Sequence, residues 1–283
     1  MNEKLFIKLQ HLVPQHELSR LIGRIANSEV KWLKNLFITW FIKRYKVDMS
    51  LAAEENPKAY ACFNDFFTRA LKPGIRPLSR EPHAIVCPAD GAISQIGKIL
   101  NGRIFQAKGQ DYTTLELLGG NEALAQEFID GDFATIYLAP ADYHRVHMPY
   151  GGKLRSMIMV PGDLFSVNTI TANNVPRLFS RNERAVTIFD TDIGPMAVIL
   201  VGAMIVAGIE TVWDGHVAPI IDREIQTSLY PFQNISLEKG AELGRFKLGS
   251  TAIVMFAKNK INWEPQFVHS STTRVGVKFA EKC

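Results

Sequence analysis

From about residue 84 onward, the chain is a succession of short apolar runs, and this feature constrains its fold most. The runs are rich in Val, Ile and Phe, and Gly, Pro, Asn and Asp separate them, which is typical of strands joined by turns. The predicted strands are Ile85–Cys87, Ala92–Leu100, Arg103–Ala107, Phe133–Ala139, Lys153–Val160, Val186–Asp190, Met196–Glu210 and Ala252–Ala257. Short helices are predicted at Tyr112–Leu118 and Asn121–Asp130, so the pattern favours one large antiparallel sandwich or barrel.

The longest apolar run, Gly194–Ile209, is almost free of charge. A helix that spans a bilayer needs about 20 apolar residues. This run is shorter, is interrupted by Gly202 and Gly208, and is rich in Val and Ile. It therefore favours two buried strands, or one bent strand, over a membrane span.

The first 46 residues instead carry the period of amphipathic helices. Apolar side chains recur at i, i+3, i+4 and i+7 in two stripes, formed by Leu18, Leu21, Ile22 and Ile25 and by Leu33, Leu36, Phe37, Trp40 and Phe41. Pro14 separates an earlier short helix from these two. The segment holds nine Lys and Arg against three Glu, while the remainder holds 23 basic and 25 acidic residues. This composition suits a helix lying in a membrane interface, and equally a helix packed on the protein's own core, with Lys34 and its basic neighbours solvated.

Residues 47–80 form a connector with a helix predicted over Phe63–Leu71, which Lys72-Pro73-Gly74 would end. The expected fold class is thus α+β, with a helical region and connector at 1–80 and a β-rich core at 81–283. The three cysteines, Cys62, Cys87 and Cys283, are odd in number and form no CxxC pair, which indicates free thiols in a reducing compartment. Cys87 lies in an apolar run and is predicted to be a core residue.

A Gly-Ser pair, Gly249-Ser250, lies in the β-like run of residues 245–251. Glycine does not crowd its own carbonyl, so the following serine can attack it, although a tight turn is the favoured interpretation of such a pair taken alone. Ser250 lies outside any Gly-x-Ser-x-Gly elbow. Asp90, His147 and Ser250 are residue types that form an acid–base–nucleophile triad, yet they are scattered over 160 residues, and Asp90-Gly91 also fits a turn.

His144 and His147 stand three residues apart. On a helix this spacing would let them share a metal ion. No third ligand follows at a zinc-type spacing, and Pro140 and Pro149 favour a loop or short turn. We therefore expect no metal at this segment.

Several long segments, taken together and in order, resemble the bacterial type I family of phosphatidylserine decarboxylases. The segments are Phe63–Arg69, Pro88–Gly91, Gln106–Gly109, Asp142–Pro149, Val160–Asn168, Gly208–Trp213 and Arg245–Thr251. The likeness runs from about Phe63 to about Asn262 and is weaker in the N-terminal helices. Several long motifs in one order are far more specific than the Gly-Ser pair alone.

The resemblance implies a lyase that converts phosphatidylserine to phosphatidylethanolamine and CO₂ in phospholipid biosynthesis. It implies an inactive zymogen in which His147, held by Asp90, activates Ser250 to attack the Gly249 carbonyl. This autocatalytic serinolysis would leave a β chain, 1–249, and an α chain, 250–283, with Ser250 converted to a pyruvoyl group (pyruvic acid). The ketone of that group would form a Schiff base with the substrate amine and act as an electron sink, as pyridoxal phosphate does elsewhere. The family thus needs neither pyridoxal phosphate nor a metal, and it places His144 near the departing carboxylate or in the protonation of the carbanion.

The resemblance also implies where the substrate binds. Lys108 and Arg69 are candidates for the phosphate because cationic donors suit it, although solvated surface charge is the simpler interpretation of each. Phe165, Ser166 and Asn168 are predicted to line the pocket. The expected partners are phosphatidylserine in an anionic membrane, the other chain of the cleaved precursor and a second copy in a homodimer, with no nucleic acid. The expected location is peripheral, on the cytoplasmic side of a bacterial cell membrane.

Three alternatives stay open at this point. A decarboxylase of the same pyruvoyl chemistry could act on a soluble amino acid, and an assay on serine against phosphatidylserine would decide. A non-catalytic lipid-binding protein would keep an uncut chain with an unmodified Ser250. A serine hydrolase would react with a fluorophosphonate probe.

Overall fold

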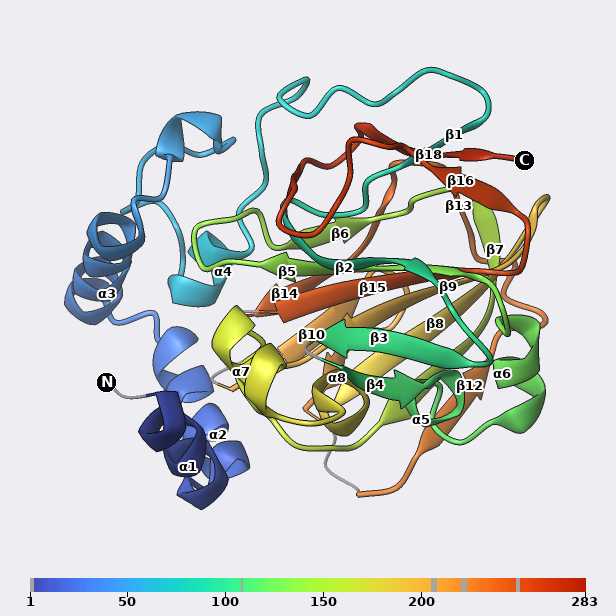
Figure 1. Ribbon diagram of the computed structural model, residues 1–283. Coiled ribbons are helices and arrows are strands. Elements are labelled where there is room, and N and C mark those ends of the chain that lie inside the picture. The colour runs from blue at the N-terminus through green and yellow to red at the C-terminus, as the bar shows by residue number, and fades with distance from the viewer. Residues whose placement is uncertain (1–2, 108, 205–207, 220–222, 248–249) are drawn as a thin grey trace.

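The N-terminal helices lie on one side of a β-rich core (Figure 1). The computed structural model describes residues 3–107, 109–204, 208–219, 223–247 and 250–283. The first helices are α1 (Glu3–Leu12), α2 (Gln15–Ala26), α3 (Lys31–Tyr45) and α4 (Phe63–Phe67), with a 3-10 turn at Met49–Leu51. Three of them fall within the first 46 residues, and Pro14 lies directly before α2. The predicted helices and their separation at this proline are confirmed.

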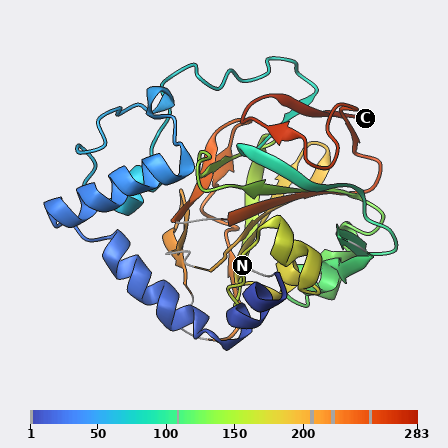
Figure 2. The ribbon, with the colours of Figure 1, turned by 60° about the vertical axis from the view of Figure 1, so that its left-hand side comes forward.

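Helix α3 packs on the connector through aromatic rings. The ring centroids of Phe37 and Phe41 lie 4.1 and 5.0 Å from that of Phe63 in α4. Lys34 differs from the prediction, because it is buried and its Nζ donates to the carbonyl oxygens of Lys58 and Tyr60. Figure 2 shows α1, α2 and α3 following one another along one edge of the molecule. Within the described parts of the chain, no helix is both long and apolar enough to cross a membrane.

The main sheet has nine antiparallel strands. Their order is β12 (Gln226–Leu229), β7 (Gly152–Val160), β8 (Arg184–Thr191), β9 (Gly194–Val201), β15 (Ser250–Phe256), β5 (Asp132–Leu138), β2 (Gly91–Lys98) and β17 (Thr272–Thr273), and β13 (Ser236–Leu237) also pairs with β7. The central strand β15 is buried along its whole length. Its alternate residues face two different cores, which explains why this run is apolar throughout rather than alternating.

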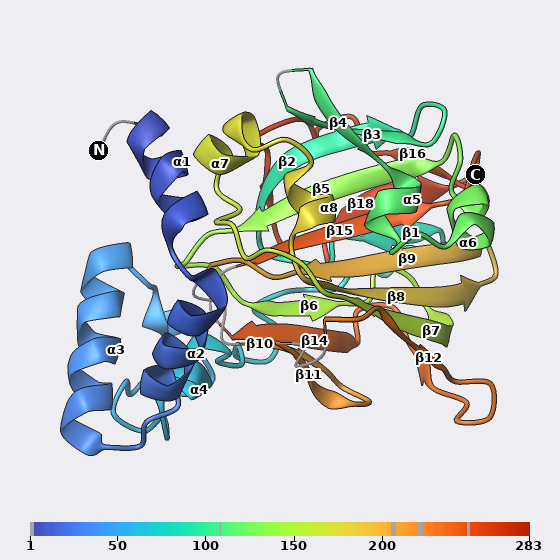
Figure 3. The same ribbon diagram turned by 90° about the horizontal axis from the view of Figure 1, so that it is seen from below.

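Two smaller sheets form a second layer against the main sheet (Figure 3). One has the order β11 (Gly215–Ala218), β10 (Gly208–Thr211), β14 (Glu242–Lys247) and β6 (Arg145–His147), and the other has the order β1 (Ala84–Val86), β18 (Lys278–Lys282) and β16 (Ile261–Trp263). A core that includes Val254 of the main sheet and Phe246 and Phe279 of the smaller sheets fills the space between the layers. The α+β class is confirmed, and the core is an open sandwich of sheets rather than a closed barrel.

The opposite face of the main sheet is covered by a second apolar cluster. The covering elements are the strand pair β3 (Arg103–Ala107) and β4 (Gln110–Thr113) and the helices α5 (Thr114–Leu117), α6 (Glu122–Glu127), α7 (Thr169–Asn174) and α8 (Leu178–Arg181). Ile253 and Met255 of β15 face this cluster. The central strands of the main sheet are therefore buried on both faces, whereas the edge strand β12 is exposed. The boundary predicted near residue 80 stays a prediction.

Three segments differ from the predicted elements or resolve an open choice. The helix predicted over Phe63–Leu71 is wrong in its last residues, because α4 ends at Phe67 and the chain then turns so that Arg69 reaches carbonyl groups of another segment. The segment 112–118 begins as β4 and becomes α5 only after Thr113, whose side chain and that of Glu116 form a capping box. The run 194–209 contains two strands, β9 and β10, which lie in different sheets.

Candidate functional site

Ser250 opens the central strand of the main sheet. It pairs with Leu138 of β5, its side chain is fully buried, and its hydroxyl has no hydrogen-bond partner among the described residues. The alternation along β15 puts the Ser250 side chain on the same face as Ala252 and Val254, toward the core between the layers. A buried hydroxyl without a partner is costly, and it needs an explanation such as a reactive role. Gly249 lies outside the described residues.

The strands on both sides of the Gly249-Ser250 bond pair with one short segment. On the N-terminal side, Phe246 of β14 donates its N–H to the carbonyl oxygen of His144 at 3.0 Å. On the C-terminal side, Ser250 pairs with Leu138. The segment 138–146, which carries His144, therefore contacts described residues on both sides of the predicted cleavage position.

His144 is a buried, neutral base. Its Nδ1 lies 2.9 Å from the carbonyl oxygen of Asp142, which can only accept, so Nδ1 carries the proton. Its Nε2 is buried with no partner among the described residues, and its ring lies against Phe67 with centroids 4.0 Å apart. Burial lowers the pKa of His144 to about 3, and the nearby charge of Arg69 acts in the same direction. The lone pair of Nε2 is thus unprotonated at neutral pH and free to accept a hydrogen bond.

His147 lies on β6 rather than in the predicted loop, and both of its ring nitrogens are engaged. Nδ1 donates to the carbonyl oxygen of Gly240 at 2.8 Å, so Nε2 accepts from the Tyr143 hydroxyl at 3.0 Å. Burial lowers the pKa of His147. Val146 points into the core between the layers, so His147 lies on the other side of β6.

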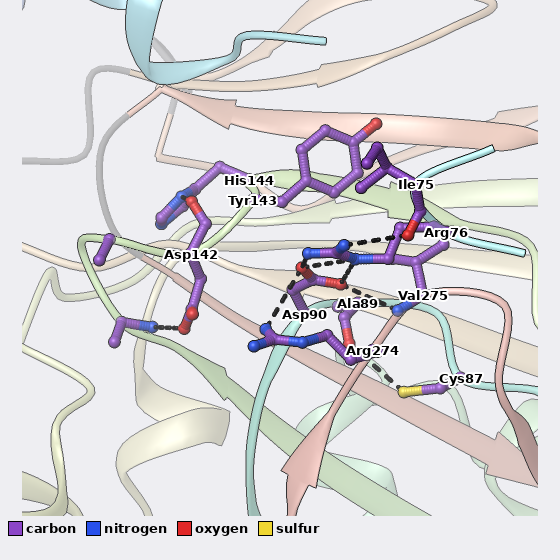
Figure 4. Close-up of polar contacts among 12 residues, drawn as sticks. Ile75, Arg76, Cys87, Ala89, Asp90, Asp142, Tyr143, His144, Arg274 and Val275 are labelled. Carbon is purple, nitrogen blue, oxygen red and sulfur yellow. Dashed lines mark hydrogen bonds and ion pairs between the residues drawn. The ribbon is translucent and has the colours of Figure 1, made fainter. Parts of the chain in front are cut away.

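Asp90 lies between β1 and β2, and its carboxylate is almost completely buried. Arg76 donates from Nε to the two oxygens at 3.0 and 2.9 Å and from Nη2 to Oδ2, which raises the pKa of Arg76 (Figure 4). The Val275 N–H donates to Oδ1 at 2.9 Å, and Nη1 of Arg274 lies 3.5 Å from Oδ2. The buried charge is therefore paired and hydrogen-bonded, as a buried charge must be.

The segments of the predicted triad are neighbours, but their side chains hold other partners. The backbone N–H of His147 donates to the carbonyl oxygen of Pro88 at 2.8 Å, two residues before Asp90. Among the described residues, no hydrogen bond joins Asp90, His147 and Ser250 to one another. Their triad roles stay predictions.

The partners of these residues are what the sequence analysis missed. Arg76 precedes Asp90 by 14 residues, and Arg274 follows it by 184. Neither spacing carries a pattern signal. The exception is Tyr143, which stands four residues before His147 inside the same motif and could have been considered as its partner.

Of the two candidate phosphate ligands, only Arg69 lies within the described residues. Lys108 lies outside the described residues. Arg69 is 5% exposed, and its Nη2 donates to the carbonyl oxygens of Ala141 at 3.0 Å and Asp142 at 3.4 Å. Its Nε and Nη1 have no partner among the described residues, and burial lowers the pKa of Arg69. Arg69 borders a cavity of about 230 Å³ that Asp90 also lines.

The three predicted pocket residues follow β7. Phe165 is buried under the Arg181 guanidinium, whose carbon lies 4.8 Å from the ring centroid. The N–H of Ser166 donates to Oε1 of Gln10 in α1 at 2.8 Å, and Oδ1 of Asn168 caps α7. These contacts position the segment, and its role toward a substrate stays a prediction.

The remaining predicted site features concern metals and thiols. Among the residues that the structure describes, no group of three His, Cys, Asp or Glu side chains could hold a metal ion. All three cysteines are free. Cys87 is buried, and burial raises the pKa of its thiol to about 12, which confirms that it is a core residue.

Large apolar side chains of α1, α2 and α3 are exposed, and we call this set the helical apolar surface. Its members are exposed large side chains: Leu5, Leu9, Leu12, Leu21, Ile25, Trp32, Leu36 and Trp40. Trp32 is 70% exposed and Leu36 is 64% exposed. In α3 the apolar stripe is thus divided, since Ile38 and Phe41 are buried in the protein while Trp32, Leu36 and Trp40 face solvent.

Known proteins of one family are similar to this chain over nearly its whole length. A family model described as phosphatidylserine decarboxylase matches residues 63–281, and a second one, described as PSD, matches residues 5–46. A phosphatidylserine decarboxylase proenzyme of Pseudomonas entomophila (strain L48) is 60% identical over 283 residues, which cover 99% of this chain and 98% of the relative. Proenzymes of the same description from Pseudomonas putida (strain F1) and Pseudomonas fluorescens (strain Pf-5) are 59% and 60% identical, over 99% and 98% of this chain and 98% and 96% of the relatives.

Proposed function

Because the chain belongs to the phosphatidylserine decarboxylase family, we propose that it is a carbon–carbon lyase that converts phosphatidylserine to phosphatidylethanolamine and CO₂. The observation that carries this is the buried Ser250 hydroxyl without a partner, at the start of the central strand. The relatives are named proenzymes, which agrees with a chain that must cut itself before it can act.

The self-cleavage would start at Ser250. Its Oγ attacks the Gly249 carbonyl carbon and loses its proton to a base, and the peptide C–N bond breaks to leave an ester. Elimination then frees the carboxyl group of residue 249. Uptake of water and loss of ammonia convert the serine remnant at residue 250 to a pyruvoyl group. The new chains are 1–249 and 250–283.

We assign the base of this step to His147 and the orienting carboxylate to Asp90, since both match the family's motifs. The backbone hydrogen bond between His147 and Pro88 supports this, because it holds the two segments side by side. In the uncut chain Nε2 of His147 accepts a hydrogen bond from the Tyr143 hydroxyl, and the Asp90 carboxylate is paired with Arg76. The step therefore requires these side chains to exchange partners.

The surroundings of Ser250 fit a pyruvoyl group. The position is fully buried beside the apolar core and offers an unpartnered polar atom. When present, the group supplies a ketone that condenses with the substrate amine and accepts the electron pair left by CO₂. Nε2 of His144 has no partner among the described residues, and we assign it the proton transfers: it would accept a proton from the substrate ammonium and return it to the substrate carbon. This cycle leaves His144 neutral at the end.

The substrate headgroup would bind through cationic side chains. Lys108 and Arg69 are our candidates for the phosphate, and Phe165, Ser166 and Asn168 for the pocket wall. Arg69 supports this in one respect, since two of its nitrogens have no partner among the described residues and it borders a cavity.

Membrane contact would involve the helical apolar surface. Large exposed apolar patches mark interaction sites, and residues 1–46 carry nine basic against three acidic side chains. Both features suit shallow insertion into an anionic membrane that contains phosphatidylserine. We propose a peripheral protein on the cytoplasmic side of a bacterial membrane, organised as a homodimer.

Intact mass spectrometry of the denatured protein tests the proposal. Two chains divided between Gly249 and Ser250 are expected, with the smaller chain carrying a pyruvoyl terminus instead of serine. Asp90→Asn and His147→Ala should stay uncut, whereas His144→Ala should be cut but inactive on phosphatidylserine. A single full-length mass for the unaltered chain would contradict the proposal, and cleavage of His147→Ala would remove that residue from the cutting step.

A further inference from the structure

The last residue of α4 and the two residues after it are attached to the His144 segment by three separate contacts. The ring of Phe67 lies against the ring of His144. The carbonyl oxygen of Thr68 accepts from Nε of Arg145 at 2.8 Å. Arg69 donates to the carbonyl oxygens of residues 141 and 142. Three consecutive residues thus contact one short stretch that lies 72 to 77 positions away in sequence.

One of these contacts reaches the atom that sets the His144 tautomer. The Asp142 carbonyl oxygen accepts from both Nη2 of Arg69 and Nδ1–H of His144. A histidine tautomer is determined by the hydrogen bond that one ring nitrogen makes. The lone pair is therefore on Nε2 because the Asp142 carbonyl points at Nδ1, and Arg69 holds that carbonyl together with its neighbour.

The charge of Arg69 lowers the pKa of His144, and the other charged groups near the ring have partners of their own. The guanidinium of Arg69 is 5% exposed, and its positive charge disfavours an imidazolium beside it. Arg145 is also close in sequence, but Glu242 of β14 pairs with it at 2.9 Å. The Asp142 carboxylate accepts from the Ala139 N–H at 2.7 Å, and burial raises the pKa of Asp142.

We propose that Arg69 is a positioning residue for His144, which keeps the ring neutral with its proton on Nδ1 and its Nε2 lone pair free. The burial of Arg69 and the two backbone partners of its Nη2 suit this role, while its Nε and Nη1 stay available for the proposed contact with phosphate. The importance of His144 for decarboxylation rests on the proposed function. The tautomer itself does not, so it can be tested in a chain that never forms a pyruvoyl group.

The test uses the full-length Ser250→Ala chain, which cannot cut itself, labelled with ¹⁵N histidine. His144→Gln in the same background identifies the His144 ring signals. In the parent we expect the Nδ1–H tautomer alone at pH 7. With Arg69→Gln we expect a mixture of both tautomers and a His144 titration midpoint about one pH unit higher, because a nearby positive charge is gone.

Two further variants make the result specific. Arg103→Gln removes an arginine from an exposed ion pair with Asp111, and it should leave the His144 signals unchanged. Arg69→Lys keeps the charge but not the planar fork, so it should keep the low midpoint and show a partial tautomer mixture. If Arg69→Gln fails to fold, Arg69→Lys decides, and a parent-like tautomer population there overturns the proposal.

Kinetics of the self-cleaved enzyme separate the two roles of Arg69. A positioning role predicts that Arg69→Gln lowers kcat at least tenfold with little change in KM, and that Arg69→Lys recovers part of kcat. A rise in KM alone, with His144 signals like those of the parent, would overturn positioning and favour phosphate binding. If the unaltered chain proved inactive on phosphatidylserine, the proposed function would fail while the tautomer result would stand.

Discussion

Replacing Arg76 by glutamine should destabilise the fold, because it leaves the Asp90 carboxylate buried without its main partner. Asp90 is 1% exposed, and Arg76 makes three of its side-chain contacts. Removing one partner of a buried ion pair costs about 3–5 kcal/mol. Val275 N–H and the half-exposed Arg274 remain, so we expect a loss of about 2–3 kcal/mol in the free energy of unfolding.

The measurement is equilibrium urea unfolding of the Ser250→Ala chain, followed by tryptophan fluorescence. This background avoids a mixture of cut and uncut molecules. With a slope of about 3 kcal/mol per molar urea, the expected loss lowers the midpoint by about 0.7–1 M. The matched control is Arg103→Gln, which opens an exposed ion pair and should leave the urea midpoint nearly unchanged.

A second substitution checks the cause. In Arg76→Gln with Asp90→Asn, no charge remains to be paired, so the double variant should be more stable than Arg76→Gln alone by about 1 kcal/mol or more. The reasoning is refuted if Arg76→Gln costs no more than the Arg103→Gln control. It is equally refuted if adding Asp90→Asn restores no stability.

The remaining predictions concern backbone approach and membrane contact. Gly91→Ala should prevent folding to a soluble protein, because its Cβ would lie 2.2 Å from the carbonyl oxygen of Tyr137. Gly97→Ala on the same strand, at nearly the same φ but with nothing within 4 Å, should fold with only a backbone penalty, and equal soluble yields of the two variants would contradict the steric argument. Trp32→Ala combined with Leu36→Ala should weaken binding to anionic vesicles at least about tenfold in a sedimentation assay, since each side chain contributes about 1.5–3 kcal/mol when buried. Raised salt should weaken binding of the unaltered chain as well, and indifference to both changes would exclude the N-terminal helices as the contact.

The local sequence pattern was sufficient to predict most helices and strands. The apolar run Ala252–Ala257 predicted a strand, and β15 contains its residues up to Phe256, all of them buried. The glycines Gly202 and Gly208 in the longest apolar run predicted its division into β9 and β10. A strand's period and a helix's stripe depend on neighbours a few residues away, so one sequence contains them. The predicted end of α4 was wrong because it depends on a distant contact. Arg69 turns away from the helix and donates to the carbonyl oxygens of Ala141 and Asp142, which are 72 and 73 residues away.

Motif order alone indicated the family and the candidate reactive residues, which are Ser250, the two histidines and Asp90. Only the tertiary structure decided their partners: Arg76 for Asp90, Tyr143 for His147 and the Asp142 carbonyl for His144. These contacts follow from strand register and from loops that meet across the sandwich, and neither is written in the spacing along the chain. The protonation state of His144 has the same origin, because burial and one backbone carbonyl set it. The sequence thus determined which chemistry is available, and packing determined which atom of each side chain is free to perform it.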